Sequence, residues 1–155
     1  MDEFKDRYGP AALVTGASSG IGLAFAEELA ARGLDLVLAA RRVDRLESLK
    51  ARLEAEHGVS VRVLRCDLAD RAAAGRLVAE CDHIDIGLVV SNAGFGAKGW
   101  FERIDAATMS EMLDVNCHAQ MQIAHGFLPR LKARGRGGLL LVSSVEGLMG
   151  GPFSA

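Results

Sequence analysis

The sequence lacks the features of a membrane-spanning, secreted or nucleic-acid-binding protein. None of its apolar runs approaches the roughly 20 residues that a membrane-spanning helix requires. Positive charge is not in excess, because the formal net charge is −2 and the isoelectric point is about 6.1. Residues 1–7 are mostly charged and lack the apolar core of a signal peptide. We therefore expect a cytoplasmic, globular protein with one domain over residues 1–155.

Disulfide and metal-ligand patterns are also missing. The three cysteines, Cys66, Cys81 and Cys117, are odd in number and do not have the spacing of a metal site, so we expect reduced thiols. His118 and His125 lie close to Cys117 along the chain, but this arrangement matches no recognised ligand pattern. The sequence also contains no internal repeat and no low-complexity tract. We expect no bound metal.

Short apolar runs alternate with amphipathic helical patterns along the whole chain. The runs predicted to form buried strands are 11–14, 34–40, 59–64, 84–90 and 138–144. Because such strands are apolar throughout, helices must cover both faces of their sheet. The pattern therefore predicts a doubly wound, Rossmann-type α/β fold with a parallel sheet, in which a ligand binds at the carboxyl ends of the strands.

Capping patterns predict where three of the helices begin. Asp44 with Glu47, and Thr108 with Glu111, have the spacing of a capping box. Asp70 is expected to cap the helix that follows the third strand. The first helix is predicted to bury one apolar stripe, formed by Ile21, Phe25 and Leu29.

The first strand runs into a glycine-rich loop with the pattern T-G-x-x-x-G-x-G, and a helix follows. Glycines let the backbone approach a phosphate, and the N-terminus of the helix offers unpaired N–H groups. Strand, glycine loop and helix in this order predict a dinucleotide site, whereas the alternative is a turn that only joins the two elements. The residues expected to contact the dinucleotide here are Thr15, Gly16, Ser18, Ser19, Gly20, Ile21 and Gly22.

Two arginines at the end of the second strand indicate which dinucleotide binds. In NAD-binding units an acid about 20 residues beyond the glycines holds the ribose 2′-hydroxyl. Here that region contains Arg41 and Arg42 instead, and a guanidinium binds a 2′-phosphate through paired hydrogen bonds. We therefore expect NADP(H) rather than NAD(H), with Arg41 as the main contact. The alternative is a pair of solvated surface cations.

Polar or glycine-containing segments follow the other strands as well. Asp67–Leu68 comes after the third strand, Asn92–Gly94 after the fourth, and Ser143–Ser144 after the fifth. Because the carboxyl ends of parallel strands meet at one edge of the sheet, these segments should converge on the glycine loop. The alternative for Asp67 and Asn92 is a purely local role in a turn and at a strand end.

Together with Val115–Asn116, in the long helix predicted over Thr108–Arg134, these segments resemble the motifs of the short-chain dehydrogenase/reductase family. The resemblance covers the whole chain and departs from the family's Asn-Asn-Ala-Gly motif at Ser91. The loop at Phe95–Gly96 and the tail at 148–153 look most like the reductases with broad or poorly assigned substrates. The cofactor-binding residues that the resemblance adds to those above are Asp67, Leu68, Asn92, Ala93 and Gly94.

The resemblance implies hydride transfer between the nicotinamide and a small carbonyl or alcohol substrate. Ser144 would polarise the substrate oxygen, and Asn116 would position a water in the proton relay. In the family a tyrosine is the general acid and base, and a lysine four residues later lowers its pKa. The sequence has one tyrosine, Tyr8, followed four residues later by Ala12. By family spacing the tyrosine would come just beyond Ala155.

We therefore expect a fold that is incomplete on its C-terminal side and an isolated chain that binds the cofactor without turnover. Two functions remain open, the N-terminal part of an NADP(H)-dependent oxidoreductase and a non-catalytic dinucleotide-binding fragment. The resemblance also implies a homodimer through the helix Thr108–Arg134, in which Pro129 should loosen the last turns. An open edge at the fifth strand would favour self-association further.

Overall fold

Five parallel strands form one sheet in the computed structural model, which describes residues 3–153. Met1, Asp2, Ser154 and Ala155 lie outside the described residues, as do the corresponding ends of the predicted domain. The strands are β1 (Ala11–Thr15), β2 (Asp35–Ala40), β3 (Val61–Arg65), β4 (Ile86–Ser91) and β5 (Gly138–Leu141). The helices are α1 (Glu3–Tyr8), α2 (Gly20–Ala31), α3 (Val43–His57), α4 (Ala73–Glu80), α5 (Ala106–Leu113) and α6 (Gln120–Arg134).

The strand order β3-β2-β1-β4-β5 confirms the predicted doubly wound fold. From β1 the chain moves to β2 and β3 on one side, and then crosses to β4 and β5 on the other. Leu13 of β1 is paired with Val37 of β2 and with Val89 of β4, so β1 is the central strand. The crevice between the ends of β1 and β4 is the switch point at which such folds bind their ligands.

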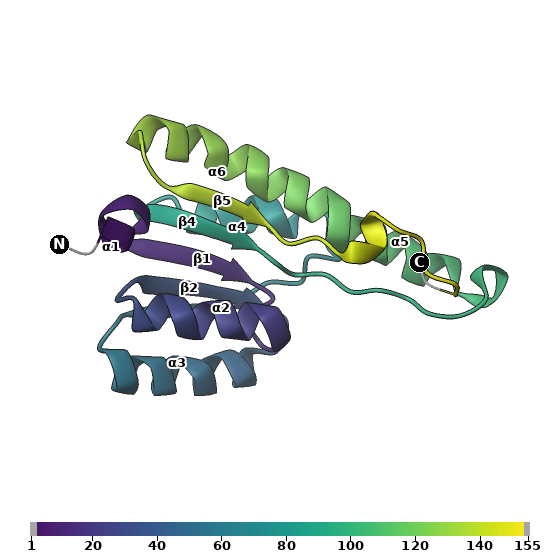
Figure 1. Ribbon diagram of the computed structural model, residues 1–155, viewed down its shortest axis with the longest axis horizontal. Helices are drawn as coiled ribbons and strands as arrows, with labels where there is room; N and C mark the ends of the chain where they lie inside the picture. The colour runs from purple at the N-terminus through teal and green to yellow at the C-terminus, as the bar shows by residue number, and fades with distance from the viewer. Residues whose placement is uncertain (1–2, 154–155) are drawn as a thin grey trace.

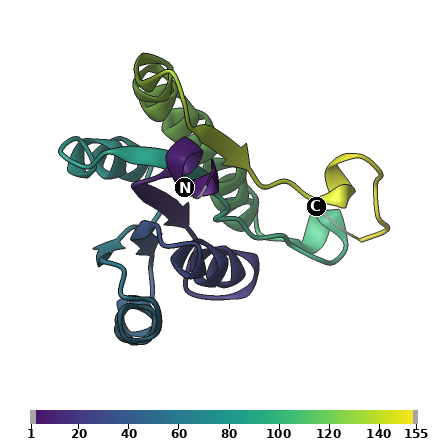
Figure 2. The same cartoon turned by 60° about the vertical axis from the view of Figure 1, so that its left-hand side comes forward.

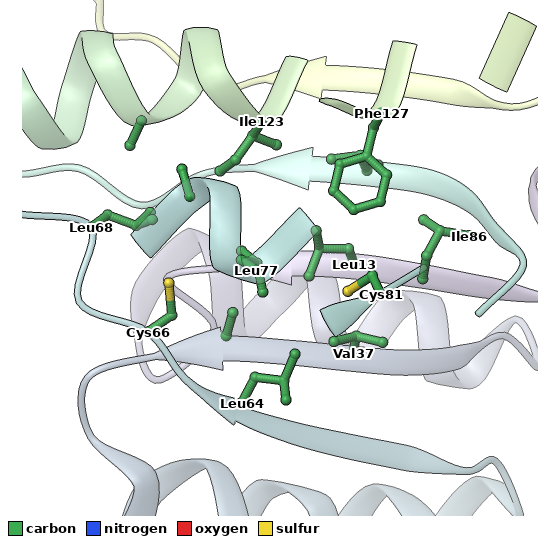
Figure 3. Close-up of a cluster of buried hydrophobic side chains, with 14 of the residues drawn as sticks. Leu13, Val37, Leu64, Cys66, Leu68, Leu77, Cys81, Ile86, Ile123 and Phe127 are labelled. Carbon is green, nitrogen blue, oxygen red and sulfur yellow. The ribbon is translucent and has the colours of Figure 1, made fainter. Parts of the chain in front are cut away.

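Helices cover both faces of the sheet, with α2 and α3 on one face and α4 and α6 on the other (Figure 1). Alternate residues of β1 therefore face different layers, as Leu13 packs toward α4 and α6 and Val14 toward α2 and α3. In Figure 3, Phe127 and Ile123 of α6 lie over Leu13 and its neighbours in the sheet. Phe127 has no exposed surface, and burying such a side chain stabilises the fold by ~1.5–3 kcal/mol.

Two of the predicted helix starts are wrong. Helix α3 begins at Val43 with Arg42 as its N-cap, so Asp44 lies inside the helix and does not form a capping box with Glu47. Helix α5 begins before Thr108, because the carboxylate of Asp105 accepts a hydrogen bond from the Thr108 N–H at 3.2 Å. In both cases the chain turns into the helix one or more residues before the predicted cap.

The predicted cap at Asp70 and the predicted stripe in the first helix also need correction. Asp70 accepts a hydrogen bond from the Ala72 N–H at 3.0 Å in the turn before α4, and α4 itself has no side-chain cap. Ile21 is 60% exposed, whereas Gly22 and Leu29 are buried against the sheet. Ile21 instead lines the cleft described below.

The predicted long helix contains a segment of different geometry. Residues 114–119 form a π-helix between α5 and α6, and such segments are frequent at functional sites. Pro129 lies inside α6, which continues to Arg134 and ends at Gly135 with a left-handed φ of 68°. The apolar spacing predicts a buried stripe of Met112, Val115, Ala119, Ile123, Phe127 and Leu131. All of these except Met112, which is only half-buried, are buried in the structure.

Strand β5 is shorter than predicted and lies at an edge of the sheet. It ends at Leu141, although the Val142 N–H still donates to the Ser91 carbonyl at 3.0 Å. Leu140 and Leu141 are partly exposed because no strand among residues 3–153 pairs with the outer side of β5. Over the same residues, no helix is long and apolar enough to cross a bilayer.

Candidate cofactor-binding site

A cleft of about 900 Å³ lies at the carboxyl ends of the strands. The loops after all five strands contribute to it, together with the π-helical segment. The predicted site residues that line it are Gly16, Ser18, Ser19, Gly20, Ile21, Arg41, Arg42, Asp67, Leu68, Asn92, Ala93, Gly94, Asn116 and Ser144. Two predicted contacts, Thr15 and Gly22, lie beneath this lining and support it, so their direct contact with a cofactor stays a prediction.

Thr15 joins the two central strands at the switch point. Its hydroxyl is buried and accepts hydrogen bonds from the N–H groups of Asn92 at 3.0 Å and Ala93 at 3.1 Å. The Asn92 side-chain amide donates in return to the Thr15 carbonyl at 3.1 Å. These three bonds hold the end of β4 against the end of β1, and so they set the floor of the cleft.

The glycines of the first loop allow an unusually close approach of backbone segments. A Cβ atom on Gly22 would lie 2.4 Å from the Gly16 carbonyl oxygen and 2.5 Å from the Asn92 amide nitrogen, so no side chain fits there. Gly20 has a φ of 57°, and a Cβ atom there would meet nothing within 4 Å. Gly20 therefore leaves open space above the N-terminus of α2, which is the geometry that a phosphate-binding loop needs.

A cluster of one arginine and two hydroxyls lies beside this loop. The Arg42 guanidinium donates to the Ser18 hydroxyl at 2.9 and 3.2 Å and to the Ser19 hydroxyl at 2.8 Å. Because both hydroxyls accept from Arg42, their own hydrogens remain available for an anion. We refer to Ser18, Ser19 and Arg42 as the arginine–serine cluster.

Arg41 takes a different direction from Arg42. Its guanidinium lies 3.6 Å from a carboxylate oxygen of Glu111 on α5, and its side chain is 64% exposed. From the sequence we expect Arg41 to be the main contact, but Arg42 is the arginine that contacts the glycine loop. Glu111 was expected only as part of a helix cap, and nothing in its local sequence indicates that it faces Arg41.

The π-helical segment holds the loop after β4. The Asn116 side chain accepts a hydrogen bond from the Phe95 N–H at 3.0 Å and donates to the Phe95 carbonyl at 2.7 Å. Gly94 lies directly against it, since a Cβ atom there would be 3.0 Å from the Asn116 amide oxygen. In this arrangement the side chain of Asn116 positions the loop, and its role in a proton relay stays a prediction.

Ser144 follows β5, at one edge of the sheet, whereas the arginine–serine cluster follows β1 and β2. The two therefore lie at opposite ends of the cleft. Its hydroxyl accepts from the Glu146 N–H at 3.1 Å, so its own hydrogen is available for a substrate oxygen. The backbone leading to it is held by Gln120, whose side chain donates to the Val142 carbonyl at 3.2 Å. Gln120 was not predicted, because its partner is distant along the chain and no motif marks it.

The two buried thiols do not add a nucleophile to the site. Burial raises the pKa of Cys66, which lines the cleft, to about 11, and burial raises the pKa of Cys81 equally to about 11. Both thiols are therefore protonated near neutral pH. Among residues 3–153 no group of three or more histidine, cysteine, aspartate or glutamate side chains is arranged to hold a metal ion.

The family model described as short chain dehydrogenase matches residues 10–155. The chain is 36% identical over 152 residues to a 7beta-hydroxysteroid dehydrogenase from Clostridium sardiniense, with 98% of this chain and 58% of that protein covered. It is 33% identical over 159 residues to a very-long-chain 3-oxoacyl-CoA reductase from Laccaria bicolor, with 100% of this chain and 47% of that protein covered. The chain thus spans about half the length of these curated relatives.

Solved structures agree with the sequence comparison. A short-chain dehydrogenase from Sphingobium yanoikuyae in complex with NADPH is similar with a TM-score of 0.87 and 37% sequence identity, over 91% of this chain and 56% of that one. With the family model matching nearly the whole chain, these likenesses show that the protein belongs to the short chain dehydrogenase family of oxidoreductases.

Proposed function

We propose that this chain is the NADP(H)-binding part of an oxidoreductase that interconverts a carbonyl group and an alcohol. The observation that carries the proposal is the arginine–serine cluster beside the open space at Gly20. A guanidinium with two available hydroxyls suits a phosphate monoester such as the 2′-phosphate of NADP(H). The NADPH bound by the relative from Sphingobium yanoikuyae supports the same choice.

Different residues of the cleft suit the diphosphate, the adenine and the nicotinamide end of this cofactor. The diphosphate would lie over the N-terminus of α2, where Gly20 leaves room for it. Asp67 and Leu68 line the cleft on the side of β3 and would hold the adenine. When bound, NADPH supplies a hydride to a carbonyl carbon, and the oxygen must gain a proton to complete the alcohol. Ser144 would donate a hydrogen bond to that oxygen.

No tyrosine among the described residues lies near this oxygen. Tyr8, the one tyrosine of the sequence, belongs to α1 and packs against Gly87 and Gly138 at the amino ends of β4 and β5. Helix α1 lies at the amino ends of the strands (Figure 1), whereas Ser144 follows the carboxyl end of β5, so the two are at opposite edges of the sheet. Because general acid catalysis contributes about 10²–10⁴-fold, we expect the isolated chain to bind NADPH without measurable turnover.

Titration calorimetry with NADPH and NADH tests the proposal. We expect the 155-residue chain to bind NADPH more tightly than NADH. The variant Gly22→Val should lose most of this binding, because its side chain would overlap the Gly16 carbonyl. Gly75→Ala is the matched control, since a Cβ atom at Gly75 meets nothing within 4 Å. The proposal fails if neither dinucleotide binds, and its NADP(H) preference fails if both bind equally.

A non-catalytic dinucleotide-binding role is the second candidate, and the remote position of Tyr8 favours it. A rate measurement separates the two candidates. If the chain is part of an oxidoreductase, adding a family segment that carries the Tyr-x-x-x-Lys pair, fused or in trans, should produce NADPH oxidation with a ketone. Steady oxidation by the isolated chain, abolished in Ser144→Ala, would instead reveal a proton donor within it.

A further inference from the structure

An ion pair joins two layers of the molecule at the carboxyl edge of the sheet. The Arg41 guanidinium, directly after β2, lies 3.6 Å from a carboxylate oxygen of Glu111 on α5. Helix α5 continues through the π-helical segment into α6, and α6 lies on the opposite face of the sheet from α3 (Figure 1 and Figure 2). The ion pair therefore connects the loop that enters α3 to the helix that leads into the other layer.

Arg41 belongs to the cleft, whereas Glu111 acts on it from outside. Arg41 lines the cleft, and so do Met112 and Leu113, which directly follow Glu111 in the chain. Glu111 itself does not line the cleft. A ligand in the cleft thus meets Arg41, and Glu111 affects that ligand through the position of the Arg41 guanidinium.

Helix α5 is anchored at both ends, so Glu111 keeps its place. The Asp105 carboxylate caps the first turn of the helix. Just beyond the last turn, the Arg71 guanidinium donates to the Asp114 carboxylate at 2.9 Å. Asp114 comes three residues after Glu111 and therefore lies on the same side of the helix. Because the helix is fixed, the flexible Arg41 side chain is the part of the ion pair that can change partner.

The ion pair is exposed, and it must loosen when Arg41 binds another anion. The side chains of Arg41 and Glu111 are 64% and 41% exposed, so water and salt screen their attraction. A phosphate monoester carries more negative charge than a carboxylate, and it accepts paired hydrogen bonds from a guanidinium. The 2′-phosphate of NADP(H) can therefore take Arg41 from Glu111, but it gains less than it would from an unpaired arginine.

We propose that Glu111 is a specificity-determining residue, which limits the preference for NADP(H) over NAD(H) by holding Arg41 away from the 2′-phosphate. The inference rests on the proposed function, because it requires the adenosine part of a dinucleotide in the cleft. NADH has no 2′-phosphate, so Glu111 lowers the affinity for NADPH alone. The acid that is missing at the end of β2 is thus partly replaced by a carboxylate from a distant helix. Glu111 is a positioning residue, because it acts through Arg41.

Two nucleotides that differ only in the 2′-phosphate isolate this effect. Adenosine 2′,5′-bisphosphate and AMP are titrated calorimetrically into the unmodified chain, Glu111→Gln, Arg41→Ala and the double variant, with NADPH and NADH in parallel. The informative quantity is the affinity for the ligand with the 2′-phosphate divided by the affinity for the ligand without it. Glu28→Gln is the matched control, because it removes an exposed carboxylate from the ion pair with Arg32 at the end of α2.

We expect this ratio to rise about threefold in Glu111→Gln, as is typical of an exposed ion pair, and to stay unchanged in Glu28→Gln. Arg41→Ala should lower the ratio about threefold in the unmodified chain. In the Glu111→Gln background the same change should lower it about tenfold, because the freed guanidinium then contributes more. The rise in Glu111→Gln should shrink at high salt.

Two results would overturn the inference while leaving the proposed function intact. The first is a ratio that does not rise in Glu111→Gln. The second is a rise of the same size when Glu111→Gln is made in the Arg41→Ala background, because the carboxylate would then act without Arg41. If none of the four ligands binds, the proposed function fails, and the inference fails with it.

Discussion

Replacing Arg42 by alanine should change the choice between NADPH and NADH. Arg42 is bonded to both serines of the glycine loop, at 2.8–3.2 Å, so its guanidinium is already placed beside the open space at Gly20. Arg41 is 64% exposed and lies beside Glu111, which would compete with a phosphate for it. The larger share of the 2′-phosphate contact is therefore expected from Arg42.

The magnitude follows from the type of bond that is lost. Hydrogen bonds to a charged group contribute ~1.5–3 kcal/mol, which corresponds to a loss of about 10- to 150-fold in NADPH affinity for Arg42→Ala. Arg41→Ala should lose only about threefold, since a solvent-exposed charge contributes at most ~1 kcal/mol. NADH affinity should change little in either variant because NADH has no 2′-phosphate.

Titration calorimetry with both dinucleotides, at low and at high salt, measures these changes. Arg42 also lies at the N-cap of α3, so a structural disturbance would weaken NADH and NADPH together. The informative quantity is therefore the NADPH affinity divided by the NADH affinity. This ratio should fall in Arg42→Ala, and it should fall less at high salt, where charges are screened. An unchanged ratio in Arg42→Ala, or a larger drop in Arg41→Ala, would refute the reasoning.

Four further results are expected. Ser91→Ala should raise the free energy of unfolding by about 1 kcal/mol in urea titrations, because the buried Ser91 hydroxyl has no hydrogen-bond partner among the described residues. Phe127→Ala should lower it by ~3–5 kcal/mol, since Phe127 is fully buried. The hydrogen bond from Arg134 lowers the pKa of Asp85 in the folded protein. The ion pair therefore stabilises the fold fully above the ordinary aspartate pKa of about 3.9, and this stabilisation is lost as the pH falls further and Asp85 becomes protonated. Arg134→Gln should remove this part of the pH dependence of the free energy of unfolding, measured in acid titrations. Sedimentation velocity should detect dimers or larger species that weaken in Leu128→Asp, and a monomer at all concentrations would contradict this expectation.

The strands and the glycine loop could be predicted because their signals are local. The continuous apolar run before Thr15 and the required glycines, such as Gly22 beside the Gly16 carbonyl, are visible without any tertiary information. The helix starts could not be predicted in the same way. Position 44 has the right chemistry for a cap, but the chain already turns into α3 at Val43, directly after Arg42.

The polar contacts of the cleft were harder still to predict. Gln120 and Glu111 lie on an amphipathic helical pattern, and each meets a partner from a different strand end. The π-helical segment around Asn116 has no local sequence signal either, because its backbone geometry depends on packing against neighbouring elements. Periodicity indicates which residues are buried, and it contains no information about which exposed polar pairs meet.

The separation of Tyr8 and Trp100 makes the chain a natural two-probe system for spectroscopy. Tyr8 absorbs and emits from the amino end of the sheet, beside Gly138, while Trp100 reports from the connection between β4 and α5, beside Phe153. Each is the single residue of its type, so their signals can be assigned without mutagenesis. Loosening of that connection alone would alter tryptophan emission first, whereas cooperative unfolding would alter both signals at the same temperature.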